Sequence, residues 1–162
     1  EILSLEVPMN WLEFVFIVIT GFTASAEFGS FAFVHPVVKR LPPKHHIMVE
    51  KGLVGTFGVF MPFAMTICSV IGISFAFMTQ DEPKHVHVLA ISSALSFALS
   101  IAFTLAINVP RNFAVTKWDV NDLPSDWKRQ RNLWEIFQGI RATLLLIGFL
   151  LLVAGILSMH AR

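Results

Sequence analysis

The sequence Asn108-Val109-Pro110-Arg111-Asn112 ends one long apolar segment, and the run Trp134-Glu135-Ile136-Phe137-Gln138-Gly139-Ile140-Arg141 opens another. The second stretch carries Arg141 into a segment that is apolar enough to enter a membrane. An arginine at the centre of a membrane helix costs about 2.5–3.5 kcal/mol on insertion scales, so it faces protein or a water-filled cavity and has a partner there. We therefore expect the other apolar segments to be arranged around the partner of Arg141.

The composition indicates an integral membrane protein. Of the 162 residues, 55% are hydrophobic and 14% are charged, whereas soluble proteins carry about 25% charged residues. A chain of this length forms one domain, and one small domain cannot hide so much apolar surface from water. The net charge of +1, without a dense basic cluster, argues against nucleic acid as a partner. We predict a single transmembrane domain, residues 1–162, in contact with the lipid bilayer.

Four apolar segments are long enough to cross a bilayer as helices, which takes about 20 residues each. They are expected at residues 11–35, 52–78, 87–109 and 133–159. Pro36, Pro83 and Pro110 are expected to end the first three helices. Residues 134, 138, 141, 145 and 148 alternate spacings of four and three, which is typical of the inward seam of a left-handed bundle. The predicted fold is all-α, an integral membrane four-helix bundle, left-handed, with short loops and one longer cytoplasmic loop between helices three and four.

The distribution of positive charge predicts the orientation. The cations of the two loops on one side are Lys39, Arg40, Lys44, Lys51, Arg111, Lys117, Lys128, Arg129 and Arg131. The opposite side has only Lys84 and Arg162. Because loops rich in Lys and Arg remain in the cytoplasm, we expect a multi-pass protein with both termini on the non-cytoplasmic side.

Glu27 is the predicted partner of Arg141. Counted from the helix ends on the cytoplasmic side, both residues lie about 12 Å deep at 1.5 Å per residue. We predict an ion pair between them. The pair is interpreted either as a structural salt bridge that fixes the helix register, or as a substrate anchor or proton-handling carboxylate.

Two further helix faces are polar. Glu27, Phe31 and His35 follow one another at intervals of four on the first helix. On the third helix the same interval relates Ser92, Ser96, Ser100, Thr104 and Asn108. Small hydroxyl residues allow close helix packing and interhelical hydrogen bonds, so this second face is either a packing surface or the lining of a polar cavity. Gln138 and Arg141 are expected to point inward together.

His46 and Glu50 are candidate metal ligands. Their i, i+4 spacing allows both to bind one ion if the stretch is helical. Together with Glu27 and His35 they would form a carboxylate and imidazole set that suits iron, zinc or manganese. Alternatively, Glu50 simply favours the start of the second helix. The cofactor remains open between none and one iron, zinc or copper ion.

Three segments carry a family resemblance: NVPRN (108–112), KWD (117–119) and DWKRQRNLWEIFQGIR (126–141). They resemble the C-terminal signature of a domain-of-unknown-function family of small four-helix membrane proteins that includes fungal anthrone oxygenases. The family pattern Asn-x-Pro-x-Asn, followed by Trp-x-x-x-His/Asn-x-x-Arg, matches Asn108, Pro110, Asn112, Trp134 and Arg141. The stretches at 26–42, 45–50 and 57–62 are similar to a bacterial branch, which implies the bacterial inner membrane.

The chain departs from this pattern at Gln138, where the family often has His or Asn. An amide does not titrate near neutral pH, so Gln138 cannot act as a base, although it can donate a hydrogen bond to a carbonyl.

The resemblance implies a membrane oxygenase or related redox enzyme that acts on a hydrophobic aromatic substrate in the cytoplasmic half of the bundle. Arg141 with Asn108 or Asn112 would orient the substrate oxygens, and Glu27 or His35 would take a proton. Trp134 and Gln138 complete the expected binding set. The alternative function is a non-catalytic structural or accessory subunit of a larger membrane complex. Candidate protein partners are therefore other membrane subunits or further copies of this chain.

Overall fold

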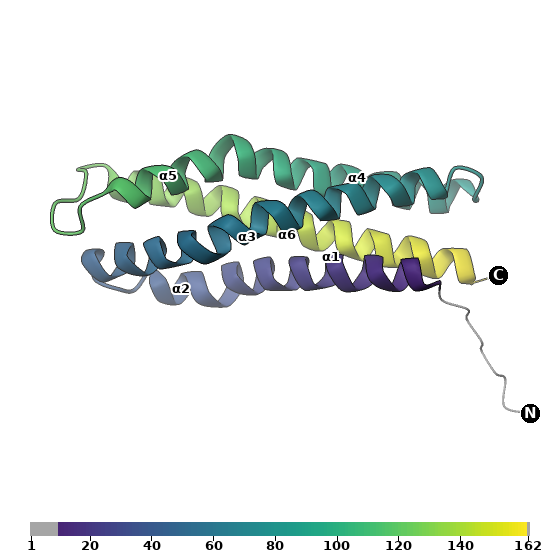
Figure 1. The fold of residues 1–162 in the computed structure, drawn as a ribbon, viewed down its shortest axis with the longest axis horizontal. Coiled ribbons are helices and arrows are strands. Elements are labelled where there is room, and N and C mark those ends of the chain that lie inside the picture. Colours follow the sequence, from purple (N-terminus) through teal and green to yellow (C-terminus); the bar gives the residue numbers. More distant parts are fainter. Residues whose placement is uncertain (1–9, 162) are drawn as a thin grey trace, which may run out of the picture.

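The computed structural model describes residues 10–161, which form four long helical rods packed side by side (Figure 1). The rods span Trp11–Val38, Pro43–Met78, Lys84–Lys117 and Trp127–His160. Each is long and apolar enough to cross a membrane. The prediction of an all-helical membrane bundle is therefore confirmed for the described residues.

Two of the rods are composite. The first consists of α1 (Trp11–Gly29), the π-helical turn η1 (Ser30–Val34) and α2 (His35–Val38). The third consists of α4 (Lys84–Phe103), the π-helical turn η2 (Thr104–Asn108) and α5 (Val109–Lys117). The other two rods are single helices, α3 (Pro43–Met78) and α6 (Trp127–His160). The linkers at 39–42, 79–83 and 118–126 join the rods, and the last is the longest.

The rods extend further than predicted at the end that carries linkers 39–42 and 118–126. Pro36 and Pro110 do not end their helices, which corrects two of the expected boundaries. Each proline follows a π-helical turn by two residues, and the turns close with bonds from His35 N–H to Ser30 O and from Val109 N–H to Thr104 O. Proline clashes with the carbonyl four residues before it in a regular α-helix. The wider turn accommodates the ring, so both rods continue.

The turn η1 also changes which residues face the interior. Along the first rod the buried positions include Thr23, Glu27 and Ser30, at spacings of four and three, and the next buried residue is His35. The step of five from Ser30 to His35 is the extra residue of the π-helical turn. Phe31, predicted to lie between Glu27 and His35 on one face, is instead partly exposed, so that prediction is wrong.

Serine hydroxyls join α4 to α6. Ser93, Ser96 and Ser100 donate hydrogen bonds to the carbonyl oxygens of Gly148, Leu144 and Arg141, at 2.7, 2.9 and 3.0 Å. Interhelical hydrogen bonds of this kind contribute about 0.6 kcal/mol each inside a membrane. The predicted polar face thus does pack against another helix, but it begins at the fully buried Ser93, because Ser92 is only partly buried.

The apolar core lies in the half of the bundle away from linker 118–126. There the rings of Phe97 and Phe75, both fully buried, fill the space left by glycines. A Cβ atom added to Gly148 would lie 2.7 Å from the Phe97 ring, and one added to Gly155 would lie 2.9 Å from the Phe75 ring. Small residues allow this close packing between helices.

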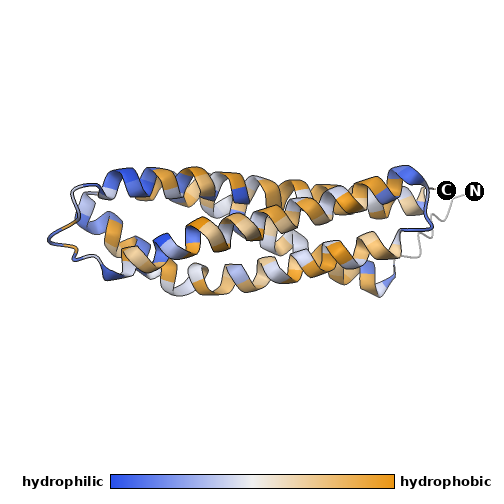
Figure 2. Cartoon of the chain, turned by 90° about the horizontal axis from the view of Figure 1, so that it is seen from above, coloured by the Kyte–Doolittle hydropathy of each residue, from blue (hydrophilic) through white to orange (hydrophobic). Residues whose placement is uncertain are grey.

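The outer surface matches a membrane environment. Large hydrophobic side chains such as Phe33, Val59 and Phe63 are more than two-thirds exposed. Figure 2 shows hydrophobic residues along the middle of the bundle and hydrophilic ones concentrated at its ends. Exposed apolar side chains carry no free-energy penalty in hydrocarbon, because lipid tails are themselves apolar. This surface is therefore consistent with lipid contact.

We expect Gly148→Ala to lower the free energy of unfolding by about 1–3 kcal/mol, because the buried Phe97 ring has no room to move aside. Gly55→Ala is the matched control, since a Cβ atom there meets no atom within 4 Å. Titration of detergent-solubilised protein with sodium dodecyl sulfate, followed by circular dichroism, measures both. Equal effects of the two substitutions would contradict the packing described for Phe97.

Candidate functional site

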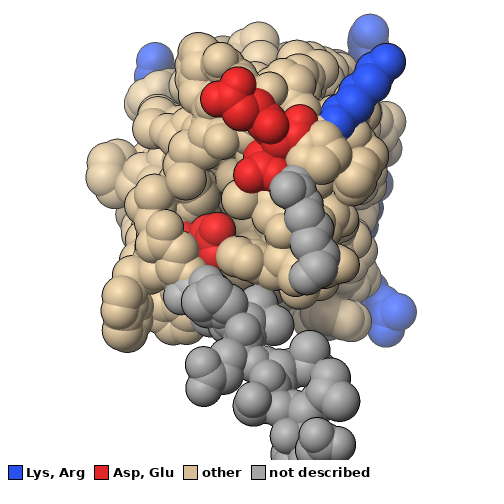
Figure 3. All heavy atoms as spheres, turned by 90° about the vertical axis from the view of Figure 1, so that its right-hand side faces the viewer, with Lys and Arg blue, Asp and Glu red and all other residues tan. Residues whose placement is uncertain are grey.

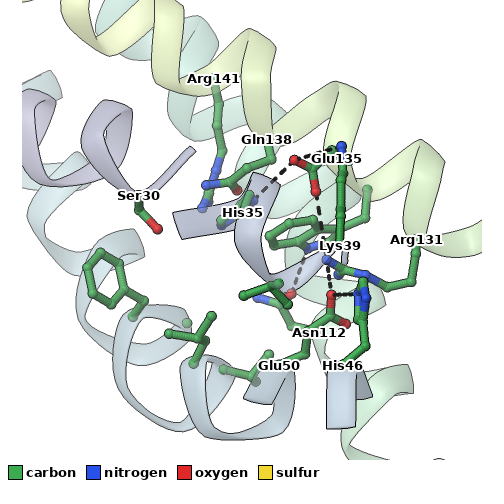
Figure 4. Close-up of a pocket in the computed structure, with 16 residues that line it drawn as sticks. Ser30, His35, Lys39, His46, Glu50, Asn112, Arg131, Glu135, Gln138 and Arg141 are labelled. Carbon is green, nitrogen blue, oxygen red and sulfur yellow. Dashed lines mark hydrogen bonds and ion pairs between the residues drawn. The ribbon is translucent and has the colours of Figure 1, made fainter. Parts of the chain in front are cut away.

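A pocket opens at the end of the bundle that carries linkers 39–42 and 118–126 (Figure 4). Its lining comes from η1, α2, the first half of α3, α5 and α6. The pocket encloses about 570 Å³ of space between atoms, including its mouth, of which about 40 Å³ admits the centres of water molecules. Such a volume holds a few waters, so a ligand with several rings requires the walls to move.

The deepest part of the site is the ion pair between Glu27 of α1 and Arg141 of α6, with 2.5 Å between Nη2 and Oε1. The predicted pairing is confirmed. Gln138 donates its amide N–H to the same carboxylate oxygen, and Nη1 of Arg141 donates to the Thr104 hydroxyl at 3.3 Å. Glu27 is fully buried, and 6% of Arg141 is exposed. Because burial removes both charges from water, each depends on the other to remain inside the bundle.

Several polar atoms around this pair have unused hydrogen-bonding capacity. Within residues 10–161, Glu27 Oε2, Gln138 Oε1 and Arg141 Nε have no hydrogen-bond partner. Both side-chain polar atoms of the fully buried Asn108 are likewise without a partner. Buried polar groups are nearly always hydrogen-bonded in proteins, so this interior is chemically suited to bind a polar group in addition to its own side chains.

A second set of charges lies nearer the end of the bundle. Glu135 of α6 forms a salt bridge with Lys39, with 3.2 Å between Oε1 and Nζ, and the same oxygen lies 3.3 Å from His35 Nδ1. Arg131 pairs with Glu50 of α3, and its distance to Glu135 is 3.9 Å. In Figure 4 dashed lines link these side chains, all of which line the pocket. Two carboxylates thus face two permanent cations, which leaves the outer network close to neutral.

His35 is held by contacts on two sides. Its Nδ1 faces the Glu135 carboxylate, and its ring stacks on Trp134 with 5.1 Å between the centroids and 21° between the planes. Trp134 is fixed in turn, because its Nε1 donates to Asn112 Oδ1 at 2.8 Å and the Arg131 guanidinium lies 4.1 Å from its ring centre. Within the described residues, no hydrogen bond engages Nε2 of His35, which belongs to the pocket lining.

The structure brings most of the predicted site residues together. Those that line the pocket are His35, His46, Glu50, Asn112, Trp134, Gln138 and Arg141. Glu27 is joined to the lining through Gln138 and Arg141. Asn108 is buried behind the pocket and is not part of its lining.

The proposed metal ligands His46 and Glu50 are in contact, with 2.7 Å between Nε2 and Oε1. The same carboxylate oxygen also accepts Arg131, so a guanidinium occupies the position beside it. Glu27 and His35 have other partners and do not join this pair, so the expected set of four is wrong. Within residues 10–161, no group of three or more His, Cys, Asp or Glu side chains could hold a metal ion.

Sequence reasoning missed Glu135, Arg131 and Lys39 as members of the site. The helix boundary explains only Arg131, because α6 was expected to begin near residue 133 and Arg131 was counted as a loop residue. Glu135 was inside the expected helix, but its contacts with His35 and Lys39 join segments that are far apart in the sequence. With α6 beginning at Trp127, Arg131 and Glu135 are spaced i, i+4. Positions 131, 134, 138 and 141 then follow the three-four spacing of a single helix face, and this spacing would have added Arg131 to the predicted site.

Comparison with known proteins identifies one family. A family model described as "Anthrone oxygenase" matches residues 55–151, which is more than half of the chain. Neither a curated protein nor a solved structure matches the chain. The matched range includes Asn112, Trp134, Gln138 and Arg141 of the pocket and ends before the apolar end of α6.

Arg141→Met should lower the free energy of unfolding by about 3–5 kcal/mol, because it leaves the Glu27 carboxylate buried without its cation. Adding Glu27→Gln to that variant should recover part of the loss, since the remaining amide is neutral. The same detergent titration, applied to both single variants and the double variant, gives the coupling between the two residues. Additive effects would mean that the two groups do not interact energetically.

Proposed function

The chain belongs to the anthrone oxygenase family, and from this premise we propose that it is a membrane oxygenase for hydrophobic aromatic ketones. The observation that best supports the proposal is His35, which lines the pocket with its Nδ1 against Glu135 and its Nε2 without a hydrogen bond within the described residues. An imidazole that donates Nδ1–H to a carboxylate presents an unprotonated Nε2, which is the arrangement of a general base.

The chemistry requires such a base. An anthrone is a tricyclic aromatic ketone with a ring methylene, and loss of one methylene proton gives an anion delocalised onto the ketone oxygen. The overall oxygenation converts the methylene and one dioxygen into a carbonyl and one water, so dioxygen is the oxidant and the source of the new oxygen atom. The protein must therefore take a proton and stabilise a negatively charged oxygen.

We assign the first task to His35 and the second to Arg141 and Gln138. Both α6 side chains line the pocket and carry N–H groups that can donate to an oxyanion. Donors fixed before the reaction stabilise developing charge more effectively than solvent does. Glu27, whose Oε1 already accepts both groups, is assigned a positioning role instead of the role of base.

Glu135 is the second positioning residue in this proposal. Its contact with Nδ1 selects the tautomer of His35 in which Nε2 is free to accept a proton. Trp134 supplies a flat aromatic surface beside the imidazole, and aromatic rings of a substrate pack favourably on such surfaces.

The alternative function is a non-catalytic subunit of a larger membrane complex. One observation favours it: the charges of the pocket are already paired with one another, and the pocket admits only a few waters. A purely structural network would have the same features. The two proposals differ in turnover, because a structural network requires no unprotonated imidazole.

We expect His35→Asn to lower the rate of anthrone oxidation about 10²–10⁴-fold, the usual contribution of a general base. Asparagine retains a donor toward Glu135 but cannot take a proton. His45→Asn is the matched control, since His45 is exposed and lies outside the pocket. Dioxygen uptake and quinone absorbance, measured on protein in nanodiscs, follow the reaction. Unchanged turnover in His35→Asn would contradict the assignment of His35 as the general base. No turnover by the unaltered protein would favour the structural alternative.

We further propose that linkers 39–42 and 118–126 face the cytoplasm. The end with these linkers carries most of the Lys and Arg residues. The opposite end carries Asp81 and Glu82 in the α3–α4 turn, and acidic side chains gather on the face seen in Figure 3. In a bacterial inner membrane this asymmetry retains the basic end inside.

Cysteine labelling tests the orientation. In a Cys68→Ser background, Gln80→Cys should react with a membrane-impermeant maleimide on intact cells, whereas Ser125→Cys should react only after permeabilisation. Both positions are exposed, so accessibility depends on the side of the membrane. The reverse pattern would invert the proposed topology.

A further inference from the structure

One wall of the pocket differs from the others. The wall from α6 consists of charged and hydrogen-bonded side chains, and the end of the first rod contributes His35 and Val38, whereas the wall from α3 beyond Glu50 consists of Leu53, Val54, Phe57 and Gly58. Phe57 both lines the pocket and is 37% exposed on the outside of the bundle. A single side chain therefore separates the interior of the pocket from the surroundings at this point.

The helix α3 packs loosely along this wall. It is buried at Glu50 and again at Met61, yet none of residues 51–60, all described by the structure, is buried. Positions 53–54 and 57–58 would face the interior if the spacing of a packed helix continued. The facing stretch of α6 is buried at Trp134, Gln138 and Arg141. The opening in the packing thus belongs to α3.

The opening is directed toward η1 and α2. On the other side of α3, a Cβ atom added to Gly58 would lie 3.4 Å from Asn112 Nδ2, so α3 and α5 are in contact there. The first rod and α6 are in contact at one point of their seam, because the Phe31 ring lies 2.7 Å from where a Cβ of Gly139 would be. Phe57 shares the pocket lining with Ser30, His35 and Val38 of the first rod, so the gap beside it is the one between α3 and that rod.

This gap is in the lipid-facing part of the bundle. Lys51 is the last charged residue of α3, and no other follows it up to Met78. Phe57 lies six residues further on, or about 9 Å along the helix axis. Neighbouring Val59 and Phe60 are exposed hydrophobic side chains. The surroundings on the outer side of Phe57 are consequently acyl chains.

The two routes into the pocket differ in their cost. Entry from water at the end of the bundle requires separation of the ion pairs that Arg131 forms with Glu50 and Glu135. This separation leaves buried charges without their partners. Entry from the membrane requires rotation of Phe57, and its ring leaves apolar contacts for acyl chains that are equally apolar. The lipid route is the one that needs no ion pair to break.

We propose that Phe57 is the gate of a lateral entrance, through which a lipid-dissolved aromatic substrate reaches His35 and Arg141 directly from the membrane. The proposal rests on the proposed function for the identity of the substrate. The entrance itself rests on the packing of α3. Phe57 then limits the size of the ring system that can enter. Without its rotation the pocket admits only a few waters, so the space that the rotation adds sets the size of the substrate.

The entrance can be tested without turnover. The test uses a variant with Trp134 as the single tryptophan (Trp11→Phe, Trp118→Phe, Trp127→Phe). Its fluorescence is measured in nanodiscs of phosphatidylcholine whose brominated acyl chains quench the indole. Phe57→Ala should raise the quenching constant about twofold, because the indole loses the side chain between it and the lipid. Quenching by aqueous iodide should remain unchanged. Phe77→Ala is the matched control, because Phe77 is an exposed phenylalanine of α3 outside the pocket lining.

The outcomes separate the routes. Equal lipid quenching in Phe57→Ala and Phe77→Ala, or a rise in iodide quenching alone, would overturn the lateral entrance. With anthrone as substrate, Phe57→Trp should lower kcat/KM about tenfold, the size of effect that one group in an apolar pocket produces, and should leave kcat nearly unchanged. If no variant oxidises anthrone, the proposed function fails, whereas the quenching result still decides whether the pocket opens to lipid.

Discussion

The ion pair between Glu27 and Arg141 is the constraint on which the rest of the structure depends. Neither charge is tolerated alone at this depth, so α1 and α6 must meet at one register. The backbone carbonyl of Arg141 also accepts a hydrogen bond from the Ser100 hydroxyl, and the Arg141 guanidinium donates one to the Thr104 hydroxyl. One residue of α6 therefore fixes the positions of both composite rods. The apolar packing of Phe97 against Gly148 and of Phe75 against Gly155 fits the same register.

The length of the rods explains why the site has two levels. A rod of 34 residues is about 51 Å long, whereas the hydrocarbon core of a bilayer is about 30 Å thick. The surplus allows the charged network around Glu135 to lie near the headgroups, about 9 Å along α6 from Arg141. The inner pair remains buried, where electrostatic interactions are stronger than in water. The pocket between the levels combines apolar walls with fixed donors.

The sequence was sufficient to predict the four helices, their membrane character and the pairing of Glu27 with Arg141, because each follows from the cost of polar groups in lipid. The same logic predicted that Gln138 points inward. Helix ends were predicted less well, since apolarity marks where hydrocarbon ends and not where a helix ends. Arg131 was missed for that reason, whereas Glu135 was missed because its partners His35 and Lys39 are far from it in the sequence. The shift from Phe31 to Ser30 on the buried face could not be predicted, because it depends on a π-helical turn that uniform periodicity does not contain.

The paired π-helical turns also restrict how such a chain can diverge. In η1 the extra residue rotates everything after it by about 100° relative to an uninterrupted α-helix. Loss of a single codon between Ser30 and His35 would restore regular winding and swing the imidazole away from α6, with no change in hydrophobicity. Related chains are thus expected to accept substitutions in these turns more readily than changes of length. An alignment gap at these five positions would accordingly mark a chain in which the imidazole no longer faces the carboxylate of α6.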